Sequence, residues 1–205
     1  MNFLKALCKK TQQIRKGAFF NSSHYELENL LCGIGTSEIL KSEIRIIDYP
    51  FKPSKVYPNR LIQASEIDAI SFDSYPPLLK IQNEVVFISR ENSNSLKLFM
   101  KRNGINSFEP SRTWSWILEP YLDTEYTVEN HKRIIKLLST KKIHEVELSK
   151  IRSEIKNQMF KYNFDTMLWE WGGLDLSDVL AAMRVKYNDE DFRDFYKRAM
   201  EIQLR

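Results

Sequence analysis

The spacing of apolar residues changes midway along the chain, and this change constrains the fold more than any other feature. Between about residues 43 and 90, apolar residues form short patches of strand length that partly alternate with polar ones. Prolines separate these patches, and they mark loops because proline cannot donate a hydrogen bond to a sheet ladder. Two patches, Leu78–Ile81 and Val85–Ile88, flank Gln82-Asn83-Glu84 and predict a β-hairpin with a tight turn.

From Ser111 onward, apolar residues recur at the three- and four-residue spacing of amphipathic helices. The last of these helices has the clearest boundaries. Asn188 is a good N-cap, and the acidic run Asp189–Asp191 would occupy the positive end of the helix dipole. Before this region, a helix in the nineties is expected to end just before Gly104, because glycine readily adopts the left-handed conformation that ends helices.

Strands followed by helices predict an α+β fold. We expect a small antiparallel sheet in the middle third, at about residues 43–90, with flanking helices, followed by an all-helical C-terminal part. The chain of 205 residues is long enough for one large domain or two small ones. The sequence predicts a basic amphipathic helix over 1–20, an α+β part over 21–110 and a helical part over 111–205, the last two packed as one compact unit.

The net charge of +4 is concentrated at the start of the sequence. Residues 1–20 contain five basic side chains and no acidic one, whereas the rest of the chain is close to electrical balance. This segment could pack its apolar side on the body and leave its lysines in solvent. It could also bind a partner protein, an anionic membrane surface or nucleic acid. The candidate contact residues are Lys5, Lys9, Lys10, Arg15 and Lys16.

The sequence contains no complete catalytic or nucleotide-binding motif. Gly33-Ile34-Gly35 lacks the third glycine of a dinucleotide fingerprint, and the phosphate-binding pattern GxxxxGK[ST] is absent. His144-Glu145 begins like the zinc-protease motif HExxH, but Leu148 stands where the second histidine must be. No GxSxG nucleophile elbow occurs. We therefore expect no cofactor.

Cysteine usage and hydropathy indicate a cytoplasmic protein. Cys8 and Cys32 are the only cysteines, and they form no CxxC pair, so we expect structural thiols in a reducing compartment. No run of apolar residues approaches the roughly 20 that span a bilayer, and lysines interrupt any apolar core of a secretory signal.

One acidic cluster is a candidate metal or acid–base site. Asp123 and Glu125 lie at a predicted helix junction close to His131, and carboxylates with a histidine can hold a divalent cation or move protons. Helix capping by Asp123 and Thr124 is the simpler interpretation, since carboxylates near helix starts are common for that reason. His131 falls on the apolar face of its predicted helix, which favours a hydrogen-bonded, partly buried histidine over a ligand.

The tryptophans are expected mainly in the core, because large aromatic side chains remove much apolar surface from water. Trp116 is the exception. It lies off the face that Trp114 and Ile117 share, and we predict that it is exposed at an interface.

Together these features favour a non-catalytic interaction or regulatory protein of the cytoplasm, with another protein as its partner. Two alternatives remain open. The first is a metal-dependent hydrolase-type enzyme that uses Asp123, Glu125 and His131. The second is weak nucleic-acid association through the basic N-terminal helix. The sequence leaves the partner, any substrate and the oligomeric state undetermined.

Overall fold

The computed structural model describes residues 22–122, 126–166 and 173–205. It confirms the predicted α+β class, with strands in the middle of the chain, flanking helices and a helical C-terminal part. Within the described ranges, every helix is too short or too polar to cross a lipid bilayer. The predicted basic helix at residues 1–20 lies outside these ranges.

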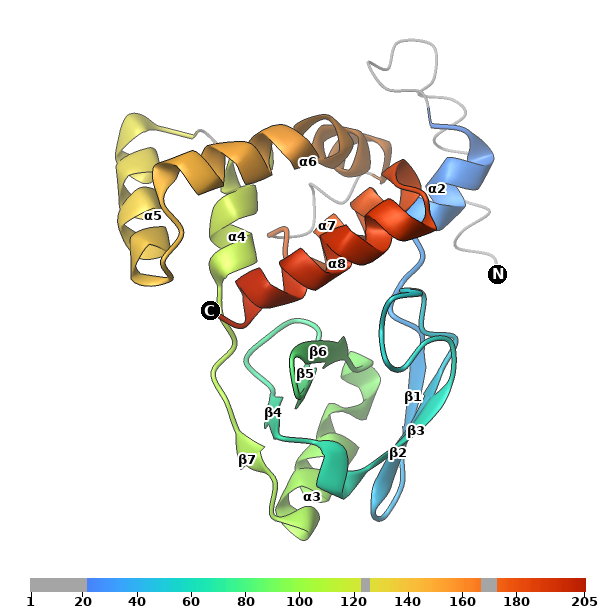
Figure 1. The fold of residues 1–205 in the computed structure, drawn as a ribbon. Helices are drawn as coiled ribbons and strands as arrows, with labels where there is room; N and C mark the ends of the chain where they lie inside the picture. The colour runs from blue at the N-terminus through green and yellow to red at the C-terminus, as the bar shows by residue number, and fades with distance from the viewer. Residues whose placement is uncertain (1–21, 123–125, 167–172) are drawn as a thin grey trace.

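The elements form two layers, which Figure 1 shows one above the other. The helical layer is the upper one in that view, and the sheet layer contains both sheets together with α3 (Ser93–Asn103). The helical layer consists of α2 (His24–Leu30), α4 (Thr113–Leu118), α5 (Val128–Thr140), α6 (Glu145–Thr166), α7 (Leu176–Lys186) and α8 (Asp189–Gln203).

The strands form two sheets where the sequence predicted one. An antiparallel sheet has the order β1-β2-β3, and a second sheet has the order β6-β5-β4-β7, in which β7 runs parallel to β4. The strands are β1 (Thr36–Ile39), β2 (Glu43–Ile47), β3 (Arg60–Gln63), β4 (Ala69–Ser71), β5 (Leu78–Ile81), β6 (Glu84–Phe87) and β7 (Asn106–Ser107). The parallel pair is possible because α3 provides the crossover between β6 and β7.

Local chemistry explains several helix ends. Asn188 accepts hydrogen bonds from the backbone N–H groups of Glu190 and Asp191 and so caps α8, as its sequence predicts. Gly104 ends α3 in the left-handed conformation, with φ of 64°. The cap predicted for α5, by Asp123 and Thr124, was wrong. Thr127 is the N-cap, because its side chain accepts from the Asn130 N–H, and α5 begins at Val128.

Helix α8 joins the two layers through a shared core. Phe51, from the loop after β2, is fully buried, and its ring lies 6.0 Å from Phe87 of β6 and 6.5 Å from Phe192 of α8. Within the helical layer, the indole N–H of buried Trp114 donates to the Ala199 carbonyl of α8 at 3.1 Å. Burying such rings stabilises a fold by roughly 3–5 kcal/mol each when measured by truncation to alanine.

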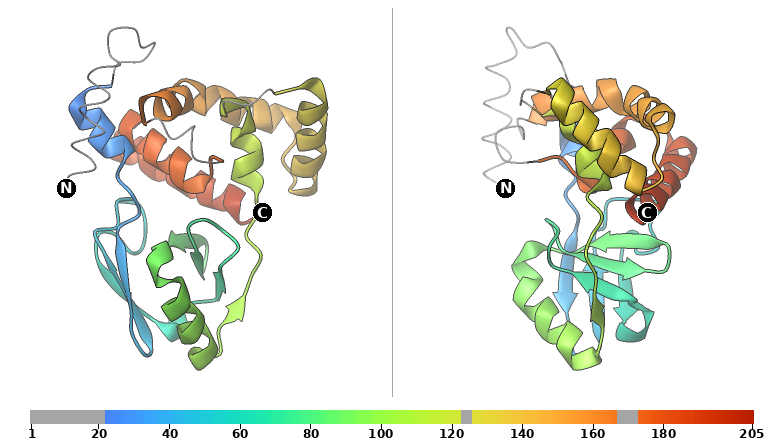
Figure 2. Two further views of the ribbon diagram at one scale, coloured as in Figure 1. Left: turned by 180° about the vertical axis from the view of Figure 1, so that it is seen from behind. Right: turned by 90° about the vertical axis from the view of Figure 1, so that its left-hand side faces the viewer.

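The chain passes between the layers through two connections, which both views in Figure 2 show as extended segments. One runs from α2 to β1 and the other from β7 to α4. The first contains Gly35 at φ +74°, where an added Cβ would lie 2.5 Å from the Ile47 carbonyl oxygen. Glycine is required there because both the backbone conformation and the space exclude a side chain.

Candidate functional site

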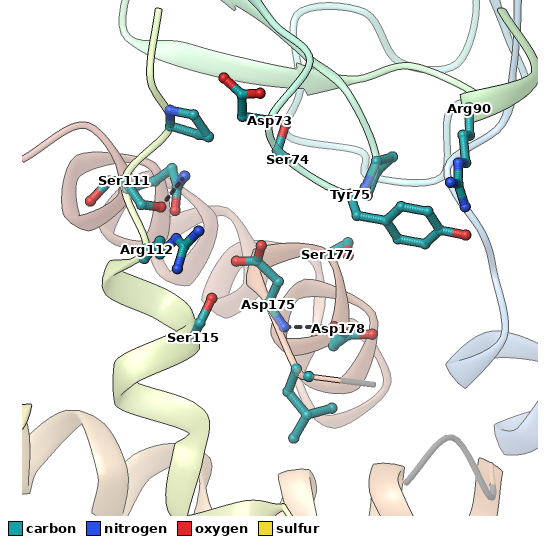
Figure 3. A pocket seen from close by; sticks show the side chains of 15 residues that line it. Asp73, Ser74, Tyr75, Arg90, Ser111, Arg112, Ser115, Asp175, Ser177 and Asp178 are labelled. Carbon is teal, nitrogen blue, oxygen red and sulfur yellow. Dashed lines mark hydrogen bonds between the residues drawn. The ribbon is translucent and has the colours of Figure 1, made fainter. Parts of the chain in front are cut away.

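A cavity of about 720 Å³ lies where the two layers meet. The loop after β4 lines it on the sheet side, and the second connection, α4 and the start of α7 line it on the helical side. Figure 3 shows side chains from these separate segments surrounding the same hollow. Its volume is within the range of small-molecule sites, but its lining is more polar than theirs usually is.

Two arginines line this cavity without a carboxylate partner. Arg90 places its guanidinium carbon 4.6 Å from the centre of the Tyr75 ring, a cation–π contact that holds the side chain over an aromatic face. Arg112 precedes the first turn of α4 and is exposed. No ion pair joins either guanidinium to a carboxylate in the described part of the chain. Both arginines therefore have donors available for another molecule.

The carboxylates at the start of α7 are engaged in capping. Asp175 is the N-cap, and its Oδ1 accepts from the Leu176 N–H at 2.7 Å. Its own N–H donates to Asp178 Oδ2 at 2.7 Å, and the Asp178 N–H donates back to the Asp175 side chain, so the two residues form a capping box. Tyr162 from α6 donates its hydroxyl hydrogen to Asp178 Oδ1 at 2.8 Å, so protein donors engage both oxygens of Asp178.

Burial changes the acidity of this pair. It raises the pKa of Asp175 to about 6, against the lowering effect of the Leu176 N–H and with a smaller raising effect from Asp178. Burial also raises the pKa of Asp178. A carboxylate held in a partly desolvated site gains from any additional donor that a ligand brings to it.

Two buried polar atoms at the cavity have no hydrogen-bond partner among the described residues: Ser74 Oγ and Gln203 Oε1. Gln203 is only 5% exposed. Its Nε2 donates to the Ser111 carbonyl at 3.1 Å, and a carbonyl requires a donor, so this bond fixes the orientation of the amide and leaves Oε1 unpaired. An unpaired buried acceptor costs roughly 1–3 kcal/mol, which a ligand with a donor can recover.

The polar side chains of the lining are hydroxyls, carboxyl groups, guanidiniums and one amide. Histidine, cysteine and lysine are absent from the described residues that line the cavity. Four serines are present, and the hydroxyl of Ser111 hydrogen-bonds to that of Thr113 at 2.5 Å rather than to a base. A nucleophilic serine needs an adjacent base within hydrogen-bond reach.

The metal site predicted from the sequence remains untested. Asp123 and Glu125 lie outside the described residues. His131 is half-buried, and its Nδ1 lies 3.0 Å from the Tyr126 hydroxyl, while its Nε2 lies 4.0 Å from Glu145 Oε1. Groups of three or more potential ligands of the His, Cys, Asp and Glu types do not occur within the part of the chain that the structure describes.

Trp116, the described residue among the other predicted site residues, does not line the cavity. Trp116 is half-buried and packs against the core, and its carbonyl accepts from Arg152 Nη2 at 3.1 Å. The interface predicted for it stays a prediction. Lys5, Lys9, Lys10, Arg15 and Lys16 fall outside the described residues, so their proposed contacts also stay predictions.

Sequence reasoning missed every residue that the cavity brings together. Arg90, Arg112 and Asp175 come from segments far apart in the chain, and only tertiary packing makes them neighbours. One local signal was present: an aspartate followed three residues later by another, directly before an apolar run, marks the start of α7.

No family model matches this chain, and neither a curated protein nor a solved structure is significantly similar to it. A function therefore has to be inferred from the geometry and chemistry of the cavity.

Proposed function

We propose that this chain is a non-catalytic binding protein whose recognition site is the cavity between its two layers. The observation that supports this proposal is the separation of charge within one hollow. Arg90 and Arg112 have no ion-pair partner among the described residues, although Asp73 and Asp175 line the same space. Opposite charges that remain apart in one cavity can each bind a complementary group of another molecule.

The engagement of the acids supports binding over catalysis. A general acid or base must exchange a proton with a reacting group, and so it needs a free oxygen within reach of that group. Protein donors engage both oxygens of Asp178, and the Asp175 side chain accepts from the backbone N–H groups of Leu176 and Asp178. These carboxylates hold the start of α7 in place, and a rigid helix start positions a binding surface.

The proposal also includes the wider expectations from the sequence: another protein as partner and a location in the cytoplasm. The cavity is too small for a whole protein face, so a partner would insert one polar group into it. The basic segment at residues 1–20 and Trp116 would add contacts elsewhere on the partner.

The test compares which components of a native cell extract bind to the immobilised full chain and which bind to its variants. The double variant Arg90→Gln and Arg112→Gln removes both cavity guanidiniums. Its matched control, Arg102→Gln with Arg193→Gln, removes two exposed arginines that do not line the cavity. We expect wild type and control to retain one component in a molar amount close to that of the immobilised protein. The cavity variant should lose this component, and the component should be recovered chemically unchanged.

Two results would contradict the proposal. If wild type and the cavity variant retain the same components in the same amounts, the cavity is not the recognition site. If the retained component is converted into a product, the chain is an enzyme, and the metal-dependent alternative built on Asp123, Glu125 and His131 becomes the next hypothesis to test.

A further inference from the structure

The charges that line the cavity nearly cancel. Two guanidiniums, from Arg90 and Arg112, face three carboxyl groups, from Asp73, Asp175 and Asp178. One of these carboxyls, that of Asp178, already accepts a hydrogen bond from the protein at each oxygen. A strongly anionic or cationic ligand would gain from one set of charges and lose to the other. The electrostatics of the cavity therefore favour a ligand without net charge.

Hydrogen-bonding groups of both kinds cover the same surface. Hydroxyls of Ser74, Ser115 and Ser177 can donate or accept, the arginines only donate, and Gln203 Oε1 only accepts. Figure 3 shows Asp175 and Arg112 on neighbouring segments with Ser115 and Ser177 beside them. A ligand that pairs with donors and acceptors on the same surface needs groups that can both donate and accept a hydrogen bond. The hydroxyl is the common group that does both.

The unpaired buried atoms support the same conclusion. Ser74 Oγ and Gln203 Oε1 are polar atoms from opposite layers that the described protein leaves without a partner. Both belong to residues that line the cavity. The Asp175 carboxylate accepts from two backbone N–H groups and, with about four acceptor sites in all, can accept further hydrogen bonds in a partly desolvated position. A ligand with several hydroxyl groups could pair with the carboxylate directly, and with the two buried atoms once the side chains that cover them move.

We infer that the cavity binds an uncharged, hydroxyl-rich ligand, a sugar unit that is either free or at the end of a glycan. This inference rests on the proposed role of the cavity as the recognition site. Sugar hydroxyls would donate to Asp175 and Gln203 and accept from Arg112, while the serines complete the polar surround. The volume of about 720 Å³ accommodates one or two sugar rings.

The test measures binding of defined probes to the full chain by ligand-observed NMR, with affinities from titration. The neutral probes are glucose, galactose, mannose and N-acetylglucosamine for a free sugar, and maltotriose and chitotriose for a glycan end. Glycine, a zwitterion without net charge, and inorganic phosphate, an anion, are the probes that carry charged groups. We expect at least one neutral probe to bind, and the comparison of monosaccharide with trisaccharide identifies the source of the sugar.

Variants locate the site. Asp175→Asn keeps an N-cap oxygen but replaces the second acceptor with a donor, and Arg112→Gln removes the guanidinium. Each should weaken binding of the preferred sugar by about tenfold or more, the effect of losing a charged hydrogen bond. Asp194→Asn and Arg102→Gln, at exposed positions outside the cavity, should leave the affinity unchanged. Thermal unfolding of each variant checks that it is folded.

Three results would overturn the inference. The first is that every neutral probe binds more weakly than a Kd of about 10 mM. The second is that glycine or phosphate binds in preference to the sugars. The third is that folded Asp175→Asn and Arg112→Gln proteins bind sugar as tightly as wild type. If the sugars fail but the retained component of the extract still depends on Arg90 and Arg112, the cavity remains the recognition site and only the ligand class is wrong.

Discussion

Tyr196 in α8 donates its hydroxyl hydrogen to Oε1 of Glu84 in β6 at 2.8 Å, which ties the helical layer to the sheet layer. Glu84 is only 5% exposed. The Ser54 hydroxyl also donates to Oε1, and the Lys55 N–H donates to Oε2 at 3.2 Å. Neutral donors thus surround this buried carboxyl group, and no salt bridge to it occurs among the described residues. Of these donors, Tyr196 is the one that comes from the helical layer.

Tyr196→Phe should therefore destabilise the protein by about 1–3 kcal/mol, since it removes a hydrogen-bond donor from a buried carboxyl group and keeps the ring. Denaturant unfolding at neutral pH measures the change. Tyr25→Phe is the matched control, because Tyr25 is 74% exposed, and it should change stability by less than about 0.5 kcal/mol. Equal stabilities for wild type and Tyr196→Phe would show that the hydrogen bond from Tyr196 to Glu84 does not stabilise the contact between the layers.

The two glycines between α2 and β1 should respond differently to alanine. Both have positive φ, but space around Gly33 is open, whereas a Cβ at Gly35 would meet the carbonyl oxygens of Ile47 and Asp48 at 2.5 and 2.9 Å. Gly33→Ala should cost about 1 kcal/mol from backbone strain alone. Gly35→Ala should lower the free energy of unfolding by at least about 3 kcal/mol, because the backbone at Ile47 and Asp48 must also move. Unfolding midpoints of the two variants compare these costs, and equal losses would contradict the predicted clash.

The ion pair between Glu26 of α2 and Lys161 of α6 should contribute stability that depends on pH. The hydrogen bond from Lys161, with help from the Ser23 N–H, lowers the pKa of Glu26 from 4.5 to about 2. A lowered pKa means that the contribution is complete above pH 4.5 and disappears as the pH falls toward 2. Both side chains are partly exposed, so solvent screening reduces it to about 1 kcal/mol.

Glu26→Gln tests this prediction, because glutamine preserves the capping box at the start of α2 while it removes the charge. The stability difference from wild type should shrink between pH 4.5 and pH 2. A difference that stays constant over this range would show that the ion pair is not its origin.

Asp175 should show the opposite pH dependence. Burial raises its pKa from 3.8 to about 6, so the folded state binds the proton more tightly than the unfolded state does. Its stabilising effect is therefore present below pH 3.8 and is lost as the pH rises through 6. Asp175→Asn does not titrate, so its stability relative to wild type should increase between pH 4 and pH 7 by up to about 3 kcal/mol. Unfolding at both pH values measures this, and an unchanged difference would contradict it.

Features that depend on local chemistry were predictable from the sequence, and features that depend on packing were not. The hairpin of β5 and β6, the end of α3 at Gly104 and the cap at Asn188 each follow from residues close together in the chain. Strand β7 has two residues and exists only because β4 lies beside it, so no local pattern reveals it. The cavity depends on packing in the same way, because Arg112 and Asp175 are distant in the sequence and only the folded chain places both in its lining.

Gln203 is the last residue of the cavity lining to be synthesised. It belongs to α8, which follows every other segment of the lining in the sequence. A chain synthesised only as far as α7 would lack the Gln203 amide, which donates to the Ser111 carbonyl and carries the buried acceptor Oε1. The proposed recognition site is therefore complete only once α8 has been synthesised and has packed against the other segments of the lining.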